Sequence, residues 1–204
     1  MADTNMTRDL PFSQACENNK QPILESLSKI FVHPGVILEI GTGTGQHAVH
    51  FASHLPHLQW QPSDHPDNVD VCVARINQAD LPNILPPVAL DVSREPWLVG
   101  DVDGVFSANT AHIMGWLEVE AMFRGVARRL KAGAAFCLYG PFNYDGQYTS
   151  DSNRRFDEQL KQQAPQMGIR DLRDLEQLGV KVGLELEQDA KMPANNRLLV
   201  WRQA

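Results

Sequence analysis

The sequence predicts an α/β protein built on a Rossmann-like, seven-stranded, mostly parallel sheet with helices on both faces. Through residue 140, short apolar runs rich in β-branched residues alternate with segments of helical periodicity. The last two apolar runs, 180–187 and 197–202, follow each other directly and predict a terminal hairpin. Alternation that ends in a hairpin is difficult to reconcile with a closed eight-stranded α/β barrel.

The composition is that of an ordinary globular chain. With 204 residues, 43% of them hydrophobic, the chain is long enough for one domain with a full core. Its net charge of −7 argues against a nucleic-acid-binding surface. The three cysteines are too few and too far apart for a disulfide framework or a zinc site, which favours a reducing, cytoplasmic setting. No apolar run reaches about 18 residues, so no membrane span is expected.

A polar segment, Phe12–Lys20, precedes a predicted helix that has apolar residues at positions 23, 24, 27 and 30. Helix capping and solvation are the simple explanation for its polar residues, Asn19 and Lys20 among them. In a doubly wound sheet, however, a segment just ahead of the first strand can fold over the carboxyl ends of the strands, where ligands bind.

A glycine-rich turn follows the first predicted strand, residues 36–40. Glu39 stands two positions before the turn, and Thr42 lies within it. The turn glycines occupy every second position: Gly41, Gly43 and Gly45. Glycine tolerates positive φ and lets the backbone approach a ligand, and the helix that starts next offers unpaired N–H groups. The turn therefore predicts a site for a polar ligand.

The spacing of this turn narrows the class of ligand. A dinucleotide fingerprint needs a further glycine where Gln46 stands, so a nicotinamide-dependent reductase is disfavoured. A phosphate-binding P-loop needs a lysine, and none occurs between Lys29 and Lys131. An acid two positions before Gly-x-Gly-x-Gly resembles motif I of the class I S-adenosylmethionine-dependent methyltransferases, where the turn packs against the methionine part of the cofactor. A glycine-rich turn of some other α/β protein is the alternative.

Acidic residues follow the next two predicted strands, 58–62 and 87–90. Asp64 lies about 20 residues past the glycines, where a carboxylate can accept both ribose hydroxyls, and a helix N-cap is the alternative. In class I methyltransferases a residue placed like Asp91 contacts the adenine amino group and its neighbour packs on the ring. The resemblance therefore implies that Asp91 and Val92 bind adenine; a plain loop position is the alternative.

Three histidines, His47, His50 and His54, lie on one face of the helix after the glycine turn, where they can hold a metal ion. No carboxylate joins them on that face. We therefore expect surface or cofactor-adjacent histidines, with His47 beside the cofactor, and no metal.

The fourth predicted strand, 103–108, leads into Asn109 and His112 at the switch-point side of the sheet, where catalytic groups tend to lie. His112 is the nearby side chain whose unperturbed pKa suits a general base near neutrality. Asn109 is a candidate contact of both the cofactor and the reacting groups. Capping of the strand end is the alternative for both residues.

A helix over 117–131, closed by Gly133, and a strand over 134–139 follow. Tyr139 ends the strand and Tyr144 comes soon after it. The two tyrosines are candidates to line a methyl-acceptor pocket, although core or lid positions suit them equally.

Helices are also expected over 150–163 and 171–178. Asn153 lies near the start of the first of these helices, and Asn195 and Asn196 lie in the turn of the terminal hairpin. Helix capping and tight turns explain these asparagines as well as substrate binding does.

Several segments together resemble one narrower family, the methyltransferase-like family called domain of unknown function 938, which includes an animal methyltransferase-like protein. The segments cover nearly the whole chain: ENNKQPIL (17–24), LEIGTGTGQHAVHFA (38–52), WQPSD (60–64), NTAHIMGW (109–116), YGPFNYDGQYTSDSNRRFD (139–157), MGIRD (167–171) and MPANN (192–196). YGPF followed by MPANN is far more specific than the glycine turn. Asn18 departs from the family pattern, which has an arginine there, and Gly41-Thr42-Gly43 stands where a small residue and a serine are expected before the second glycine.

The resemblance implies the class I fold with an antiparallel last strand, and a site for S-adenosylmethionine whose product is S-adenosylhomocysteine. It implies no particular substrate. The predicted cofactor-binding residues are Glu39, Gly41, Thr42, Gly43, Gly45, His47, Asp64, Asp91, Val92 and Asn109. The predicted catalytic residues are Asn109, His112, Tyr139 and Tyr144. The predicted substrate-binding residues are Asn19, Lys20, Tyr139, Asn153, Asn195 and Asn196.

We therefore expect an S-adenosylmethionine-dependent methyltransferase that acts on a small molecule, as a monomer or homodimer, with no nucleic-acid or membrane partner. A non-catalytic sensor of S-adenosylmethionine or a nucleoside is the alternative. We expect a single domain, 1–204, with a lid segment (1–20), a cofactor-binding core (36–140), and substrate-side helices with the terminal hairpin (141–204). The segment Phe12–Lys20 and the hairpin turn should meet over the carboxyl ends of strands one, four and five.

Overall fold

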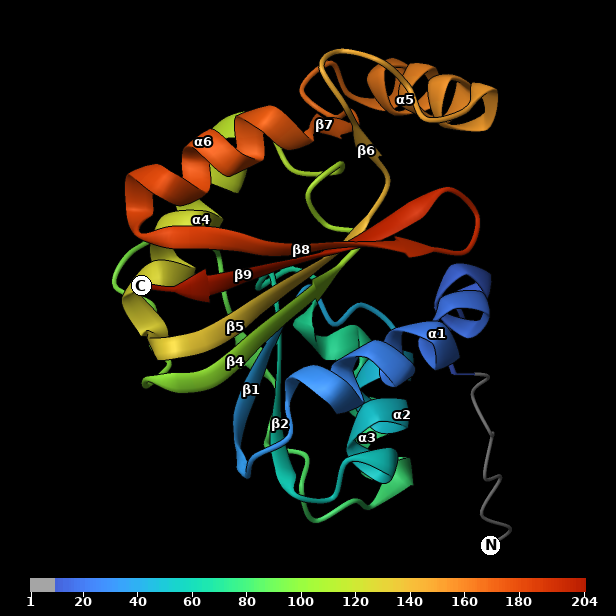
Figure 1. The fold of residues 1–204 in the computed structure, drawn as a ribbon. Helices are drawn as coiled ribbons and strands as arrows, with labels where there is room; N and C mark the ends of the chain where they lie inside the picture. Colours follow the sequence, from blue (N-terminus) through green and yellow to red (C-terminus); the bar gives the residue numbers. More distant parts are fainter. Residues whose placement is uncertain (1–9) are drawn as a thin grey trace, which may run out of the picture.

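A seven-stranded sheet with the strand order β3-β2-β1-β4-β5-β9-β8 lies at the centre of the protein (Figure 1). The structure is a computed structural model and describes residues 10–204. β9 pairs antiparallel with β5 and β8, and the other pairs are parallel, which confirms the predicted fold class. The strands are β1 (Gly35–Ile40), β2 (Leu58–Asp64), β3 (Val88–Ala89), β4 (Val102–Ala108), β5 (Leu130–Gly140), β8 (Leu184–Met192) and β9 (Asn196–Gln203).

Helices cover both faces of this sheet. The apolar residues of α1 and α2 belong to one core and those of α4 and α6 to the other, while α3 packs against α2. α5 lies outside the two layers, near the tip of the β8–β9 hairpin (Figure 1). The helices are α1 (Gln14–Ile30), α2 (Gln46–His54), η1 (Val69–Val71), α3 (Val73–Ala79), α4 (Trp116–Arg129), α5 (Asp151–Gln163) and α6 (Leu172–Val182).

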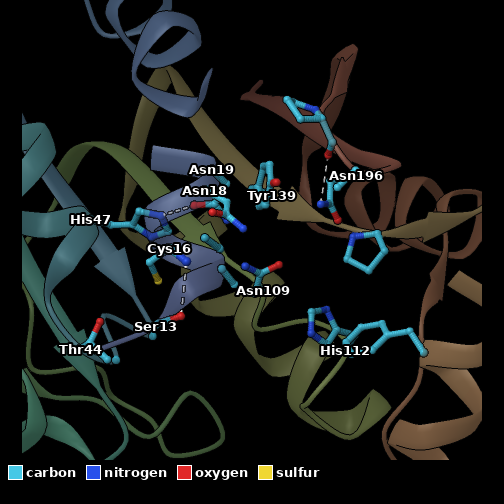
Figure 2. Close-up of a pocket in the computed structure, with 18 of the residues that line it drawn as sticks. Ser13, Cys16, Asn18, Asn19, Thr44, His47, Asn109, His112, Tyr139 and Asn196 are labelled. Carbon is cyan, nitrogen blue, oxygen red and sulfur yellow. Dashed lines mark hydrogen bonds between the residues drawn. The ribbon is translucent and has the colours of Figure 1, made fainter. Parts of the chain in front are cut away.

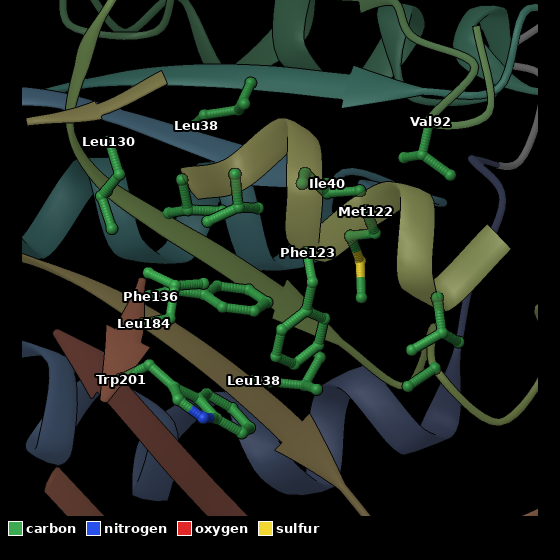
Figure 3. Close-up of a cluster of buried hydrophobic side chains, with 14 of the residues drawn as sticks. Leu38, Ile40, Val92, Met122, Phe123, Leu130, Phe136, Leu138, Leu184 and Trp201 are labelled. Carbon is green, nitrogen blue, oxygen red and sulfur yellow. The ribbon is translucent and has the colours of Figure 1, made fainter. Parts of the chain in front are cut away.

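The alternating strand geometry supplies both cores. Consecutive side chains of a strand point to opposite faces of a sheet, so Ile37 packs with α1 and α2 while Leu38 packs with α4. On the second face the rings of Phe123, Phe136 and Trp201 contact one another, with centroids 5.2–5.5 Å apart (Figure 3). Each such buried side chain contributes on the order of 2 kcal/mol through removal from water.

The topology opens a crevice at the carboxyl end of β1. This strand lies between β2 and β4, and Ile40 pairs with Ser63 on one side and Ser107 on the other. The chain leaves β1 toward β2 and later returns to β4, so the connections at this edge diverge. Open α/β sheets bind ligands at such a point.

Helix α1 begins earlier than predicted. Ser13 is its N-cap, accepting a hydrogen bond from the backbone N–H of Cys16 at 3.3 Å. Most of the polar segment Phe12–Lys20, predicted to precede a helix, therefore lies in the first two turns of α1, which begins at Gln14. The prediction for residues 1–20 as a lid lies partly outside the described residues, which begin at residue 10.

The boundary between α4 and β5 also differs from the prediction. The helix ends at Arg129, and Leu130, which is buried, pairs with Val102 at the start of β5. Gly133, predicted to close the helix, instead lies within β5 at a φ of 74°. It lies where the register between β4 and β5 shifts, and this irregular pairing was not visible in the local pattern.

The boundaries of the C-terminal elements also differ from the prediction. Helix α6 continues to Val182 and ends at Gly183, whose φ of 85° suits a helix C-terminus, so the prediction of a strand over 180–187 was wrong for its first residues. A short parallel pair, β6 (Phe142–Asn143) with β7 (Arg170–Asp171), was not predicted. Within residues 10–204 no helix is both long enough and apolar enough to cross a membrane.

Candidate functional site

A cavity of about 710 Å³ opens at the carboxyl edge of β1, β4 and β5 (Figure 2). Its volume lies within the range typical of small-molecule and cofactor sites. One side, here called the turn side, is formed by Gly41–Thr44 and His47. The opposite side, here called the amide side, is formed by Asn109, Tyr139, Asn153 and Asn196. The N-terminus of α1 closes the cavity between them.

The glycine turn brings its backbone to the cavity without side chains in the way. Gly41 has a φ of 77°, and a Cβ atom there would stand 2.4 Å from Cγ2 of Thr110, so no larger residue fits. Gly43 has a φ of 56° and no atom within 4 Å of such a Cβ. The space beside Gly43 is therefore open on the side of the cavity. Gly45 is the N-cap of α2 and does not line the cavity itself.

Glu39 supports the turn from inside the protein. Its carboxylate is buried and accepts hydrogen bonds from Thr42 Oγ1 at 3.1 Å and Trp60 Nε1 at 2.9 Å. Burial raises the pKa of Glu39 to about 7. Glu39 does not line the cavity, so the prediction that it contacts the cofactor needs correction: its side chain acts on the turn, whereas Thr42 lies at the surface of the cavity.

Asp64 is the last residue of β2, two residues beyond the predicted strand end. Its Oδ2 accepts a hydrogen bond from the backbone N–H of Gly43 at 2.7 Å, and its Oδ1 accepts one from His65 at 2.8 Å. The carboxylate therefore lies at the outer edge of the turn, beside the cavity rather than in its lining.

Asp91 and Val92 lie farther from the cavity. Val92 is buried in the core beside α4, so its side chain packs inside the protein. Asp91 Oδ1 accepts hydrogen bonds from the backbone and hydroxyl of Ser93, and Arg94 lies 3.1 Å away; these contacts lower the pKa of Asp91. Neither residue lines the cavity, so the structure does not bring them to the turn side.

Two side chains at the start of α2 hold α1 in place. The amide of Gln46 accepts from the backbone N–H of Ser13 at 2.6 Å and donates to Ser13 O at 3.3 Å. His47 Nε2 lies 2.7 Å from Asn19 Oδ1, and the His47 ring stacks on Phe51. Burial lowers the pKa of His47 to about 4, so this contact joins two neutral groups.

The row of three histidines divides in the structure. His47 faces α1 and the cavity, whereas the rings of His50 and His54 lie 4.4 Å apart and His54 Nδ1 contacts the backbone oxygen of His50. Among residues 10–204, no group of three metal-ligating side chains of histidine, cysteine, aspartate or glutamate has a geometry that could hold a metal ion.

Tyr139 links the two segments that we expected to meet. Asn19 of α1 and Asn196 of the hairpin lie beside its hydroxyl group (Figure 2). Burial raises the pKa of Tyr139, and hydrogen bonding to the two asparagines opposes that rise. The N-terminus of α1 and the hairpin turn thus line one cavity together.

Tyr144 lies elsewhere, so its prediction as a cavity residue needs correction. Its hydroxyl donates a hydrogen bond to Asp189 at 2.7 Å, and burial together with this bond raises the pKa of Tyr144. Tyr144 does not line the cavity. The turn after Gly140 carries the tyrosine ring to the β8 strand instead, a pairing that local sequence does not reveal.

His112 lies at the cavity beside the amide side, and its role as a general base stays a prediction. The ring is 6% exposed and meets Phe156 edge-on, with centroids 5.2 Å apart. Burial, with a smaller contribution from Arg170, lowers the pKa of His112 to about 4. The imidazole is therefore neutral near pH 7 and only weakly basic, which removes the premise that its ordinary pKa suits general-base work.

Asn109 has a left-handed backbone conformation, as does Ala194 on the hairpin side of the cavity. It follows β4 with a φ of 59°, a left-handed conformation that asparagine adopts more readily than most residues, and its backbone N–H donates to Tyr139 O at 2.8 Å. Its side chain lines the amide side of the cavity (Figure 2).

The remaining predicted substrate residues divide into those inside and those outside the cavity. Asn153 lines it and is 6% exposed. Asn195, with a φ of 58°, forms the hairpin turn and contacts Ser152. Lys20 is half-buried and forms an ion pair with Glu17. Neither Lys20 nor Asn195 lines the cavity, so for both the plainer alternative of capping, turn formation or solvation fits better.

Several lining residues were not singled out from the sequence. They come from the start of α1, the glycine turn, α5 and the hairpin: Ser13, Cys16, Thr44, Phe156 and Pro193. Phe156 lies inside a segment that resembles the family, so that resemblance was the available signal. For Ser13 the signal was its place as a serine before a helical segment.

Known proteins match this chain in sequence and in structure. The model of the family described as "Protein of unknown function (DUF938)" matches residues 10–203. An O-methyltransferase family protein from Burkholderia thailandensis superposes with a TM-score of 0.79 at 16% identity, covering 91% of this chain and 56% of that one. An O-methyltransferase family 2 protein from Planctomyces limnophilus, solved with apigenin, gives 0.80 at 13% identity, with coverage of 93% and 58%.

Human N-acetylserotonin methyltransferase, solved with S-adenosylmethionine, gives a TM-score of 0.78 at 16% identity, with coverage of 94% and 53%. The chain thus spans little more than half the length of these structures. At such identities the match shows the shared fold.

Proposed function

This chain belongs to the DUF938 family, and from its fold and its cavity we propose that it is an S-adenosylmethionine-dependent methyltransferase that acts on a small molecule. The single observation that carries the proposal is the open backbone cradle at Gly43, placed between an uncapped helix N-terminus and the carboxylate of Asp64. The structural neighbours, which are methyltransferases of the same fold, support it.

The turn side fits the cofactor in shape and polarity. No side chain caps α2 and no acidic residue lies in its first turn, so its N–H groups can receive a carboxylate such as that of the methionine part. Thr44 and His47 stand at the same helix start. In this proposal Gly41, Thr42, Gly43 and Gly45 supply the backbone surface, and Asn109 borders it from β4.

Asp64 and Asp91 are proposed to bind the nucleoside part. Asp64 keeps its carboxylate at the edge of the turn through the N–H of Gly43, and a carboxylate there suits the two ribose hydroxyls. Asp91 and Val92 follow the next strand along the same edge and remain the proposed adenine residues. Because both lie outside the cavity lining, binding of adenine would require contact along the exposed edge of the turn.

The protein contributes alignment and exclusion of water. S-adenosylmethionine, when bound, supplies a methyl group on a sulfonium that is already activated for transfer. The closed end of the cavity under α1, held by Gln46 and His47, limits access of water to the reacting centre. Neutral His112 and Tyr139 orient the acceptor by hydrogen bonds. With a pKa of about 4, His112 is a poor proton acceptor, so acceptors that methylate without a strong base suit this site.

The extent of the cavity favours an enzyme over the non-catalytic sensor. A sensor needs space for the cofactor alone, whereas this cavity continues from the glycine turn to Asn153, Phe156 and Asn196. This continuation offers the second compartment that an acceptor requires. The oligomeric state, monomer or homodimer, stays a prediction.

The test is transfer of a labelled methyl group. Purified protein is incubated with labelled S-adenosylmethionine and fractionated metabolite extracts, and methylated products are identified by mass. We expect at least one labelled small molecule with the wild-type protein and none with Gly43→Val. Gly146→Val is the matched control, because Gly146 also has a positive φ (76°) and open space around it but lies outside the cavity. Binding of S-adenosylhomocysteine without any labelled product would favour the sensor.

A further inference from the structure

The residues that line the cavity carry no formal charge. Among the described residues at its surface there is no aspartate, glutamate, lysine or arginine. Polar groups are nevertheless abundant, because amide side chains reach it from α1, from the end of β4, from α5 and from the hairpin. The amide side, which lies away from the N-terminus of α2, therefore offers an acceptor only uncharged polar groups and can discriminate between acceptors by their charge.

Away from Asp64, which borders the turn side, several charged groups near the cavity are paired with other protein groups. Behind α1, Lys20 pairs with Glu17. Beside the hairpin, Arg197 contacts Asp189 at 2.6 Å. Lys20 of α1 and Arg197 of the hairpin are thus each neutralised by a carboxylate of the protein.

The charged groups beneath α5 and behind His112 are also paired with protein groups. Asp157, one residue beyond Phe156, is almost fully buried and is bound by Lys161 at 2.6 Å, Tyr148 at 2.6 Å and the backbone N–H of Ile169 at 2.7 Å. Arg170 donates to backbone oxygens in the 111–114 turn and to Gln166. Each of these charges is satisfied by the protein and has no need of a ligand.

The two histidines of the cavity do not add charge near neutral pH. Burial lowers the pKa of both His47 and His112 to about 4, and burial keeps the hydroxyl of Tyr139 protonated by raising its pKa. The ligand therefore meets neutral donors and acceptors.

Some of these neutral groups are held in fixed orientations. Asn153 Nδ2 donates to Thr149 Oγ1 at 2.9 Å and to the backbone oxygen of Asn195 at 3.2 Å. Because both of its N–H groups are used, the amide cannot flip without loss of these bonds, and its oxygen remains to accept a hydrogen bond. On the hairpin, Asn196 Nδ2 donates to Pro193 O, and the same amide lies beside the Tyr139 hydroxyl.

We propose that the acceptor is an uncharged molecule that carries both a hydrogen-bond donor and an acceptor, such as an amide, a lactam or a hydroxylated ring, and that Asn153 and Asn196 determine this specificity. The inference deepens the proposed function and rests on it for the identity of the reaction. On the amide side, away from the N-terminus of α2, a carboxylate, phosphate or ammonium group of the acceptor would lose its hydration without an opposite charge to replace it. A neutral amide instead pairs with the amides already present, and a site built for such pairing rejects ligands that leave its groups unpaired.

The experiment compares probes of equal shape and different charge. Nicotinamide and nicotinate, and benzamide and benzoate, are titrated by ligand-observed NMR at pH 7.5, with and without saturating S-adenosylhomocysteine. We expect each amide to bind at least tenfold more tightly than its carboxylate. Equal affinities, tighter binding of the carboxylates, or no detectable binding of either amide at millimolar concentration would overturn the proposal.

Two variants test whether the amide side causes the preference for amides over carboxylates. Asn153→Asp places a carboxylate among the cavity amides and is expected to weaken amide binding at least fivefold. Gln159→Glu makes the same chemical change on the exposed face of α5 and is expected to leave it unchanged. Equal effects of the two variants would overturn the assignment, and thermal melting shows whether each variant is folded. Failure of S-adenosylhomocysteine to bind would overturn the proposed function, while the probe comparison without it still tests the charge preference.

Discussion

The two sides of the cavity are built in different ways. On the turn side, two carboxylates hold the backbone of one short glycine turn. Glu39 accepts a hydrogen bond from Thr42 inside the protein, and Asp64 accepts one from the N–H of Gly43 at the edge of the turn. On the amide side, neutral groups from β4, β5, α5 and the hairpin converge although they are far apart in sequence. One side of such a cavity can be formed by residues that are close together in the sequence, whereas the other side needs residues that only the complete fold brings together.

The largest loss of stability is expected when a side chain is added at Gly41 in the glycine turn. Its positive φ and the 2.4 Å distance to Thr110 mean that Gly41→Val adds both backbone strain and a clash. We expect a loss of about 4 kcal/mol in the free energy of unfolding, measured by denaturant titration. Gly100→Val is the control, because open space surrounds that glycine and no positive φ restricts it. Equal stability of the two variants would show that the turn is not rigid.

The buried acid beneath the turn should make stability depend on pH. The pKa of Glu39 is raised from its ordinary 4.5 to about 7, so the folded state favours the protonated form. Its contribution to stability is complete below about pH 4.5 and is lost as the pH rises through about 7. Relative to wild type, Glu39→Gln should therefore gain about 3 kcal/mol in unfolding free energy between pH 4.5 and pH 8. Parallel stability curves for the two proteins would contradict this assignment.

The contact between α1 and α2 closes the cavity and can be loosened separately. In Gln46→Leu, the backbone N–H of Ser13 loses its partner, whereas its oxygen keeps the N–H of Glu17; we expect a cost of about 2 kcal/mol and faster proteolysis near residue 13. Gln21→Leu, on the exposed face of α1, should change neither quantity by a comparable amount. Equal proteolysis of the two variants would show that Gln46 does not hold the helix.

The smallest effect is expected at Tyr144, which tests where the amide side ends. Because its hydroxyl contacts Asp189 and not the cavity, Tyr144→Phe should cost about 1 kcal/mol in stability. Its affinity for S-adenosylhomocysteine, measured by calorimetry, should change by less than twofold. A loss of more than fivefold in this affinity would show that Tyr144 belongs to the site.

The same contrast explains what the sequence could predict. The glycine turn, the seven-stranded and mostly parallel sheet, and the antiparallel last strand follow from local patterns and from the family resemblance, since periodicity and glycine spacing are local properties. His112 and Tyr139 both line the cavity, because carboxyl ends of parallel strands share one edge of the sheet.

Burial and pairing partners could not be predicted in this way. The lowered pKa of His112, the ion pair of Lys20 and the contact of Tyr144 with Asp189 depend on segments that approach only after folding. The inward orientation of Glu39 depends likewise on Trp60, which lies on the next strand. Pattern alone identifies a residue type at a strand end, while the direction of its side chain is a tertiary property.

The central claim is that the turn side binds the cofactor and the amide side binds the acceptor. The direct measurement is calorimetric titration of S-adenosylhomocysteine into wild type, Asp64→Ala and His112→Ala. The account predicts micromolar-range affinity for wild type, at least a tenfold loss for Asp64→Ala, or about 1.4 kcal/mol, and less than a twofold change for His112→Ala. Unchanged affinity in Asp64→Ala, or an equal loss in His112→Ala, would contradict it.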